Sequence, residues 1–357
     1  MPCSRIFPNR SGYIRERRQG KAFLFFASLF LCFSIRSAAQ ENRFSFTEPK
    51  MGAPFTIVMY ANDSTQAAGL AKECFRLVDS FNLIFSDYID TSELSKLSAS
   101  AGINARAVSV SPDLLDILLA AKKAFDKSDG AFDITIGPLS KFWRKARKAK
   151  KFPANEEIQP VRSLVGFNNM VIDTANKKVT MSRAGMQLDL GGIAQGWIGQ
   201  KVIDFLRGRQ IDHALVNVSG DVIMSGAPPG SKGWTIGVNV PETKDDLLPR
   251  TLLMQNKSVT TSGDAYQYID HAGKRYSHII DPRSGYGVTF QRNVTAIADD
   301  GTTADWLATA CSILPVKKAK KLAQQLGAEV LIAEFKKGKL VFYATPGFGL
   351  YWKQQQQ

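Results

Sequence analysis

Apolar residues recur along this chain at two spacings, which mark where strands and helices are expected. The continuous apolar and β-branched run at residues 55–60 predicts a strand, and Ser64 is predicted to begin a helix. Apolar residues follow Ser64 at helical spacing, namely Leu70, Cys74, Leu77 and Phe81. Ser111 and Pro112 predict the start of a second helix, because serine caps helices and proline is favoured at their first position. Gly130 is expected to stop that helix.

The second half of the chain mixes the two spacings in the same way. A helix is predicted from about 193 to 206, and paired strands are predicted at 213–218 and 222–224. Residues 328–334 and 340–344 predict another hairpin. Because helices and hairpins are intermixed, the pattern predicts an α+β fold with a mixed, mostly antiparallel sheet and packed helices.

The first 39 residues differ in composition from the rest. Seven of them are Lys or Arg, and an apolar run at 22–35 precedes the small residues Ser37–Ala39. This order is typical of a secretory signal peptide, so we expect a soluble or peripherally attached exported protein. A short membrane anchor is the less favoured alternative, because the run is below the ~20 residues of a spanning helix. Residues 40–357 have no glycine- or proline-rich linker and are expected to form one large domain.

The positive charge of the chain is unevenly distributed. The formal net charge is +14, of which the first 39 residues carry six, leaving a moderately basic body of +8 that does not indicate nucleic-acid binding. Seven Lys or Arg residues are concentrated at 141–151. This stretch is interpreted either as a solvated helix face or as a surface for an anionic membrane or an acidic partner.

Cysteine and histidine are too scarce to build a metal cluster. After removal of the signal peptide only Cys74 and Cys311 stay, each on an apolar helical stripe, so both are expected to be buried thiols. A metal site must therefore use oxygen ligands, which favours a hard cation such as Mg²⁺ or Ca²⁺.

His278 is one of only three histidines in the sequence. It lies in the polar segment 276–285, with Asp281 three positions further on, and is a candidate for proton transfer near neutral pH. The alternative is an ordinary surface turn, because Asp-Pro-Arg-Ser-Gly at 281–285 favours turns by itself.

A helix predicted from Thr302 to about Leu314 carries polar side chains on one face. Its apolar face contains Leu307, Ala310, Cys311 and Leu314. The opposite face contains Asp305, Ala308, Thr309 and Ser312. A carboxylate and a hydroxyl one turn apart can share one Mg²⁺, but a capped, solvated helix face is the favoured interpretation of this spacing alone.

Two adjacent glycines, Gly191 and Gly192, suggest a strand at 188–190 that turns into the helix at 193. This geometry directs free backbone N–H groups toward an anion. The segment lacks the lysine of a Walker loop and the three-glycine dinucleotide fingerprint. It is therefore compatible with phosphate, but it indicates no familiar nucleotide-binding fold.

As an ordered set, these motifs resemble the ApbE-like FAD:protein FMN transferases and cover nearly all of the mature chain. The matching segments are Met51–Gly52, Ser92–Leu94, Gly130–Thr135, Asp189–Ala194, Thr261–Asp264, Ser277–Gly285 and Thr303–Thr309. The resemblance implies an exported, Mg²⁺-dependent enzyme that is either free in the periplasm or attached to the outer face of the inner membrane. Such an enzyme cleaves FAD and attaches FMN through a phosphoester to a threonine of an exported or membrane redox protein, releasing AMP.

The resemblance also implies roles for individual residues. The FAD site is expected to contain Met51, Tyr88, Ala131, Phe132, Asp133, Asp189, Gln195 and Ile279. The magnesium ligands are expected to be Asp305 and Thr309, with backbone oxygen from Gly192 and Ala308. His278 becomes the candidate base that takes the proton of the attacking threonine. Arg283 is expected to brace its turn through Asp281, and positive charge near the phosphates is its less favoured alternative role.

The chain departs from the family pattern at two places. Gln195 replaces a residue that is usually charged, which predicts a neutral hydrogen bond to FAD. The turn at 217–221 is less glycine-rich than usual, which puts its fine geometry in doubt. The segment 225–228, Ser-Gly-Ala-Pro, resembles the Ser-Gly-Ala-Thr acceptor sequence without its threonine, so the acceptor is expected to be another protein.

Two other functions are compatible with the same motifs. An FAD pyrophosphatase would use water instead of threonine and release FMN and AMP. A non-catalytic flavin-binding protein of the envelope is disfavoured, because His278, Asp305 and Thr309 are all present.

Overall fold

The fold is given by a computed structural model that describes residues 41–102, 104–240, 247–263 and 267–354. The predicted signal peptide lies outside these ranges and stays a prediction. Residues 40–357 make one compact unit. Within the described ranges, every helix is too short or too polar to cross a membrane.

An eight-stranded sheet forms the centre of the fold, in the order β1-β2-β6-β7-β10-β13-β14-β15. The strands are β1 (Asn42–Lys50), β2 (Ala53–Ala61), β6 (Ala214–Val218), β7 (Asp221–Ser225), β10 (Ser258–Gly263), β13 (Arg292–Ala298), β14 (Glu329–Lys336) and β15 (Lys339–Ala344). Each neighbouring pair is antiparallel. The predicted strand at 55–60 and both predicted hairpins are confirmed.

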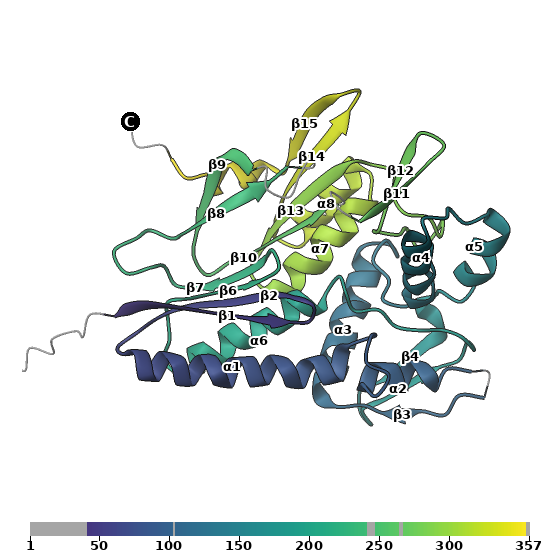
Figure 1. Ribbon diagram of the computed structural model, residues 1–357, viewed down its shortest axis with the longest axis horizontal. Coiled ribbons are helices and arrows are strands. Elements are labelled where there is room, and N and C mark those ends of the chain that lie inside the picture. The colour runs from purple at the N-terminus through teal and green to yellow at the C-terminus, as the bar shows by residue number, and fades with distance from the viewer. Residues whose placement is uncertain (1–40, 103, 241–246, 264–266, 355–357) are drawn as a thin grey trace, which may run out of the picture. The chain divides into compact units, whose positions relative to one another are not determined.

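The two faces of this sheet are covered by different elements (Figure 1). Helices α1 (Ser64–Phe85), α3 (Pro112–Lys127), α6 (Ala194–Gly208), α7 (Gly301–Ile313) and α8 (Val316–Gln325) lie on one side. The other side is covered by β8 (Trp234–Asn239), β9 (Leu247–Met254) and the 3-10 helix η2 (Pro346–Tyr351). Alternation along β2 explains both layers, because Ile57 packs among the helices and Val58 packs toward β8 and β9.

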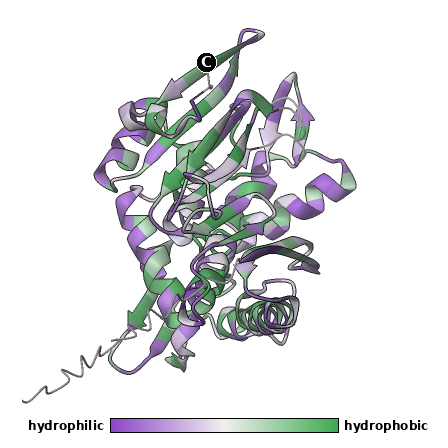
Figure 2. Cartoon of the chain, turned by 90° about the vertical axis from the view of Figure 1, so that its left-hand side faces the viewer, coloured by the Kyte–Doolittle hydropathy of each residue, from purple (hydrophilic) through white to green (hydrophobic). Residues whose placement is uncertain are grey.

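The remaining elements lie beside the helical face. They are α2 (Glu93–Ala99), β3 (Val108–Ser109), α4 (Gly137–Ala149), α5 (Asn155–Arg162), η1 (Phe167–Asn169), β4 (Met170–Asp173), β5 (Lys178–Met181), β11 (Tyr268–His271) and β12 (Lys274–Ser277). Strands β3, β5 and β4 form a small sheet, and β11 pairs with β12. In Figure 2 the strands of the large sheet are mostly hydrophobic, whereas the outer helices alternate between hydrophobic and hydrophilic residues. The prediction of an α+β fold with a mostly antiparallel sheet is confirmed.

Capping residues set the helix starts as the sequence predicts. The Ser111 hydroxyl accepts a hydrogen bond from Leu114 N at 3.2 Å, and Pro112 is the first residue of α3. Cys74 and Cys311 are both buried free thiols, as expected. The strand expected at 188–190 is wrong, because the described chain makes only an isolated bridge between Ile136 and Gln187 there. Pairing stops at that bridge because the chain enters α4 at the next residue, Gly137.

Helix α7 differs from its prediction in burial. Asp305, Ala308 and Ser312, which were placed on a face opposite the core, are buried as well. The reason is that α7 lies between β10 and β13 on one side and α6 on the other, so both faces are largely covered and only Thr302, Thr303 and Thr309 are half-buried. The interpretation of this face as solvated is therefore wrong.

Helices α6 and α7 cross at two glycines near their first turns. A Cβ added at Gly196 would lie 2.1 Å from Gly301 O and 2.7 Å from Asp305 Cβ. Only a hydrogen atom fits at this crossing. The close approach brings Gly196 N within 2.9 Å of Asp305 Oδ2, so the backbone of α6 positions a carboxylate of α7.

We expect Gly196→Ala to lower the free energy of unfolding by about 3 kcal/mol, because the added methyl group must push two helices apart. Gly69→Ala is a matched control, since a Cβ at this exposed position of α1 meets nothing within 4 Å. The control should gain about 0.5–1 kcal/mol from the better helix propensity of alanine. Urea denaturation measures both, and a Gly196→Ala protein of wild-type stability would show that the crossing tolerates a methyl group.

Candidate functional site

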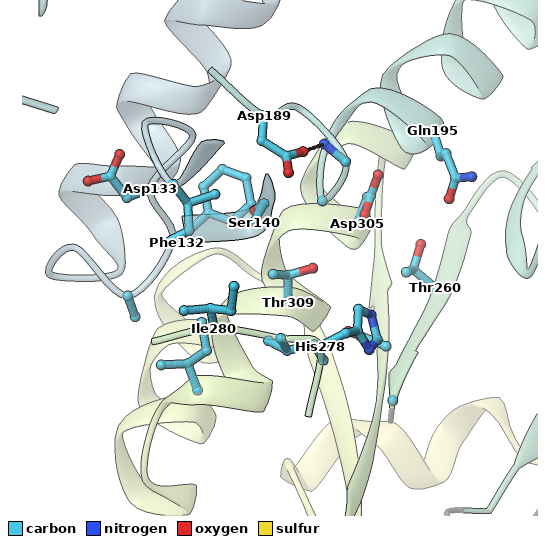
Figure 3. A pocket seen from close by; sticks show the side chains of 18 of the residues that line it. Phe132, Asp133, Ser140, Asp189, Gln195, Thr260, His278, Ile280, Asp305 and Thr309 are labelled. Atoms are coloured by element: carbon cyan, nitrogen blue, oxygen red, sulfur yellow. Dashed lines mark hydrogen bonds between the residues drawn. The ribbon is translucent and has the colours of Figure 1, made fainter. Parts of the chain in front are cut away.

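A cavity of about 280 Å³ lies where the first turns of α6 and the middle of α7 meet the β6–β7 turn and the end of β10. Figure 3 shows Asp189, His278, Asp305 and Thr309 around this space. The predicted site residues that line it are Ala131, Phe132, Asp133, Asp189, Gly192, Gln195, His278, Ile279, Asp305 and Thr309. Residues separated by up to 178 positions in sequence are thus brought together by the sheet and the two helices.

Three predicted residues do not line this cavity. Met51 lies in the β1–β2 turn with a positive φ of 53°. The Tyr88 ring is 76% exposed, and the Arg144 guanidinium lies 4.5 Å from its centre. Ala308 is fully buried, and its carbonyl oxygen accepts a hydrogen bond from the Ser312 hydroxyl at 3.0 Å. Their roles stay predictions.

Of the three almost fully buried carboxylates that line the cavity, Asp221 and Asp305 lie near each other. Asp305 is 4% exposed and Asp221 is 6% exposed. Burial, and secondly the nearby Asp221 carboxylate, raise the pKa of Asp305 well above its usual range. Burial raises the pKa of Asp221 to about 7, against a smaller opposing effect of the Thr260 hydroxyl. Among the described residues, neither carboxylate forms a salt bridge.

The residues around this pair fit a small hard cation. Buried carboxylates without a cationic partner are unfavourable, and a divalent ion would supply the missing charge. The Thr309 hydroxyl oxygen would lie 3.0 Å from a Cβ placed on Gly192, so a side chain at Gly192 would fill the space beside that oxygen. Carboxylate, hydroxyl and backbone oxygens are the ligands that Mg²⁺ accepts. Within the described ranges, no three or more His, Cys, Asp and Glu side chains are placed so that they could hold a metal ion together.

Asp221 was absent from the predicted site. The sequence shows it only as the end of the 217–221 turn, where an acidic residue is common. A usable signal was its position at the first residue of a strand, directly before the three apolar residues Val222, Ile223 and Met224. A carboxylate that must be buried with such a strand requires a partner, and the cavity provides the place for one.

We expect magnesium affinity to rise from about pH 6 to about pH 8. The raised pKa values of Asp221 and Asp305 keep a proton on the pair at the lower pH, and this proton must leave when the cation binds. A raised carboxyl pKa also means that the folded protein binds more protons than the unfolded chain between about pH 4 and 7. Without Mg²⁺, stability should therefore fall as pH rises through this window. Calorimetric titration with Mg²⁺ at pH 6 and pH 8 tests the predicted change in affinity, and equal affinities at the two pH values would contradict it.

The His278 side chain lines the same cavity, and its pKa is lowered there. Its backbone N–H donates to Gln267 O at 2.7 Å, which fixes the segment after β12. Burial, and secondly the Arg147 guanidinium, lower the pKa of His278 to about 4. The imidazole is therefore neutral near pH 7 and can accept a proton. Its Nδ1 has no hydrogen-bond partner within the described part of the chain.

The turn that follows His278 is braced by an ion pair. Arg283 Nε donates to Asp281 Oδ1 at 2.8 Å, and a second guanidinium nitrogen donates to Oδ2 at 2.9 Å. The prediction that Arg283 braces this turn is confirmed. The segment after β12 forms both a turn and one wall of the cavity. The two interpretations of this segment, an ordinary turn and a site of proton transfer, are therefore compatible.

Helix α4 connects the basic stretch 141–151 to the cavity. Arg144 bonds to Asp87 at 2.5 Å and to Asp189 at 3.2 Å. The other oxygen of Asp189 accepts a hydrogen bond from Gly191 N at 2.8 Å, so the glycine turn is held in place (Figure 3). The end of the stretch, including Lys150, is exposed. The stretch is therefore solvated only in part, and its inner side contributes positive charge near the cavity.

Asp133 organises the turn that leads into α4. Its Oδ1 accepts hydrogen bonds from Thr135 N at 2.8 Å and from the Thr135 hydroxyl at 2.7 Å. Burial raises the pKa of Asp133 in spite of these bonds. The neighbouring Phe132 and Ala131 then present an apolar wall to the cavity.

Comparison with known proteins agrees with this geometry. The model of the ApbE family matches residues 51–332. An FAD:protein FMN transferase from Klebsiella pneumoniae is 32% identical over 280 residues, which cover 78% of this chain and 85% of that protein. An FAD:protein FMN transferase from Haemophilus influenzae is 27% identical over 305 residues, which cover 83% of this chain and 88% of that protein.

Solved structures give the same result. The flavin transferase ApbE from Vibrio cholerae superposes with a TM-score of 0.77 at 25% identity, covering 87% of this chain and 99% of its own. The ApbE protein from Thermotoga maritima superposes with a TM-score of 0.77 at 28% identity, and the match covers 88% of this chain and 100% of that protein.

Proposed function

Because this chain belongs to the ApbE family, we propose that it transfers FMN from FAD to a threonine of another protein. The observation that carries this proposal is the cavity itself, which holds His278, Asp305 and Thr309 beside an apolar wall and a glycine turn. A neutral base and a cation-binding pair of oxygens in one cavity are what phosphoryl transfer requires. The name FAD:protein FMN transferase that the relatives carry supports transfer of FMN from FAD to a protein.

In the proposed reaction the acceptor threonine oxygen attacks the FMN phosphorus of the FAD pyrophosphate. The new bond joins threonine oxygen to that phosphorus, and the bond from phosphorus to the bridging oxygen breaks, so AMP leaves with the electron pair. His278 accepts the hydroxyl proton, which its low pKa in the free protein allows at neutral pH. Phe132 and Ile279 line the cavity with apolar surface that excludes water from the flavin nucleotide.

We further propose Mg²⁺ as the cation. Asp305 and Thr309 would hold it, with backbone oxygen from the glycine turn at Gly192. When bound, the ion neutralises charge on the pyrophosphate during its cleavage. Asp221 lies beside Asp305 and keeps the site negative once both carboxyls have lost their protons.

The acceptor is proposed to be an exported or membrane redox protein, reached in the periplasm. This proposal is supported by the secretory pattern of the first 39 residues and by the Ser-Gly-Ala-Pro segment at 225–228, which lacks an acceptor threonine. The exposed end of the basic stretch at 148–151 could approach an anionic membrane surface.

Incubation of the mature protein with FAD, Mg²⁺ and a carrier protein bearing Ser-Gly-Ala-Thr tests the proposal. Flavin fluorescence that stays on the carrier after denaturing electrophoresis is the expected result, with AMP released in equal amount. Free FMN and AMP without labelled carrier would instead support a pyrophosphatase, which needs the same cavity but uses water. Bound FAD without either product would indicate a flavin-binding protein.

A further inference from the structure

A second cavity lies on the opposite side of β10 from the first. Its volume is about 680 Å³, and it runs between the large sheet and β8. Its floor includes Leu215 of β6, Val222 of β7 and Val259 of β10, while Ile236 of β8 forms a wall. We call this cavity the β8 groove. The proposed transfer chemistry does not involve the residues that line only this groove.

The β8 groove and the first cavity share one boundary. Ser219 of the β6–β7 turn, together with Thr261 and Gly263 of β10, lines both spaces. Asp221 lines only the first cavity, and Val222, the next residue, lines only the groove. A chain lying in the groove would therefore reach the cavity where the buried carboxylates lie.

The described lining of the groove favours a protein segment over a nucleotide. Its described lining residues are threonine, serine, asparagine, glycine, proline and aliphatic side chains, and none of them is charged. Phosphate groups bind where cationic side chains gather, and the described lining of the groove contains none. Mixed apolar and hydroxyl surface suits a polypeptide backbone with small, uncharged side chains.

A buried amide marks the end of the groove at the shared boundary. Asn293 of β13 pairs with Gly263, is 5% exposed and lines the groove. Its Oδ1 finds no hydrogen-bond partner among the described residues. A Cβ on Gly263 would lie only 1.9 Å from that oxygen, so the amide fills the space above the glycine. An unused buried acceptor at this point is suited to a backbone N–H of a docked segment.

We propose that the β8 groove binds the acceptor protein as an extended segment and delivers its threonine past Ser219 and Gly263 into the first cavity. The segment would carry small, uncharged residues beside the threonine, because charged side chains would find no partner in the groove. This proposal rests on the proposed transfer reaction and adds the surface that selects its protein substrate.

Thr235→Trp tests the proposal, because Thr235 is an exposed residue of β8 that lines the groove and lies outside the first cavity. The indole should fill the groove and raise the KM for a carrier bearing Ser-Gly-Ala-Thr at least 10-fold, while the Kd for FAD changes less than 2-fold. Val171→Trp, at an exposed position of β4, is the matched control and should leave both values unchanged. Asn293→Leu removes the buried amide at similar volume and should raise the same KM.

A second carrier with lysine in place of the serine and alanine before the threonine completes the test. The wild-type enzyme should label it at least 10-fold more slowly at limiting carrier concentration. An unchanged carrier KM in Thr235→Trp, measured with folded protein, would overturn the groove proposal while leaving the transfer reaction intact. Weaker FAD binding in Thr235→Trp would assign the groove to FAD and also overturn it. Absence of any labelling by the wild-type enzyme would instead refute the proposed function.

Discussion

Replacement of Asp305 by alanine should lower the rate of FMN transfer by about 10³-fold, which corresponds to about 4 kcal/mol. The carboxylate is almost fully buried at the cavity and receives a hydrogen bond from Gly196 N, so it is fixed before any ligand arrives. Its loss would remove the charged ligand proposed for magnesium. The effect is measured as the rate of FMN transfer at saturating FAD, monitored by the flavin fluorescence of the carrier.

Two further measurements distinguish loss of the metal site from loss of the fold. Asp305→Ala should keep a cooperative unfolding transition, but Mg²⁺ should no longer raise its melting temperature. Asp299→Ala is the matched control, because this acidic residue lies just before α7 and its side chain is 82% exposed. The control should retain near wild-type transfer. Activity within 10-fold of wild type in Asp305→Ala would refute its assignment as the charged ligand.

Replacement of His278 by alanine should lower kcat by between about 10² and 10⁴-fold, the range expected for loss of a general base. The Kd for FAD should change little, because the proposed role concerns the acceptor hydroxyl. His271→Ala is the control, since His271 is exposed and stacks on Phe152 at 4.0 Å instead of facing the cavity. Transfer kinetics of both variants decide whether the histidine acts in the chemical step, and an unchanged kcat would show that it does not.

The pH behaviour of His278 gives a second readout. In the free protein its pKa of about 4 keeps the imidazole neutral above about pH 5, so acidification to pH 5 should not by itself protonate it. The negative charge of bound FAD favours the imidazolium, so the pKa should rise on binding. Nuclear magnetic resonance titration of the mature protein can follow this, and His278→Ala identifies the signal among three histidines. A pKa that falls on FAD binding would contradict the placement beside the pyrophosphate.

Most elements of the fold were predictable because their signals are local. The caps at Ser111 and Pro112, and the helical spacing after Ser64, depend only on neighbours in sequence. The strand expected before Gly191 failed for a reason that is not local, because strand pairing there is stopped by the path of α4. The burial of both faces of α7 was likewise hidden, since it depends on α6 crossing at Gly196.

The residues of the candidate site were likewise predictable only where they carry a local sequence signal. His278, Asp305 and Thr309 each lie in a segment whose composition or spacing suggests chemistry, and the structure brings them to one cavity. Asp221 carries no such local signal, because its significance comes from lying beside Asp305, 84 positions later in the chain. The β8 groove could not be predicted either, since it exists only where β8 packs over strands from four separate regions of sequence.

The alternation of β10 separates two properties that could be engineered independently. Val259 faces only the β8 groove, whereas Thr260 and Ser262 face only the first cavity. Libraries varied at Val259 and its neighbours in β8 could therefore retarget flavin labelling to new protein tags while the catalytic surface is kept constant. An insertion of one residue in β10 would exchange the two surfaces and abolish both properties together.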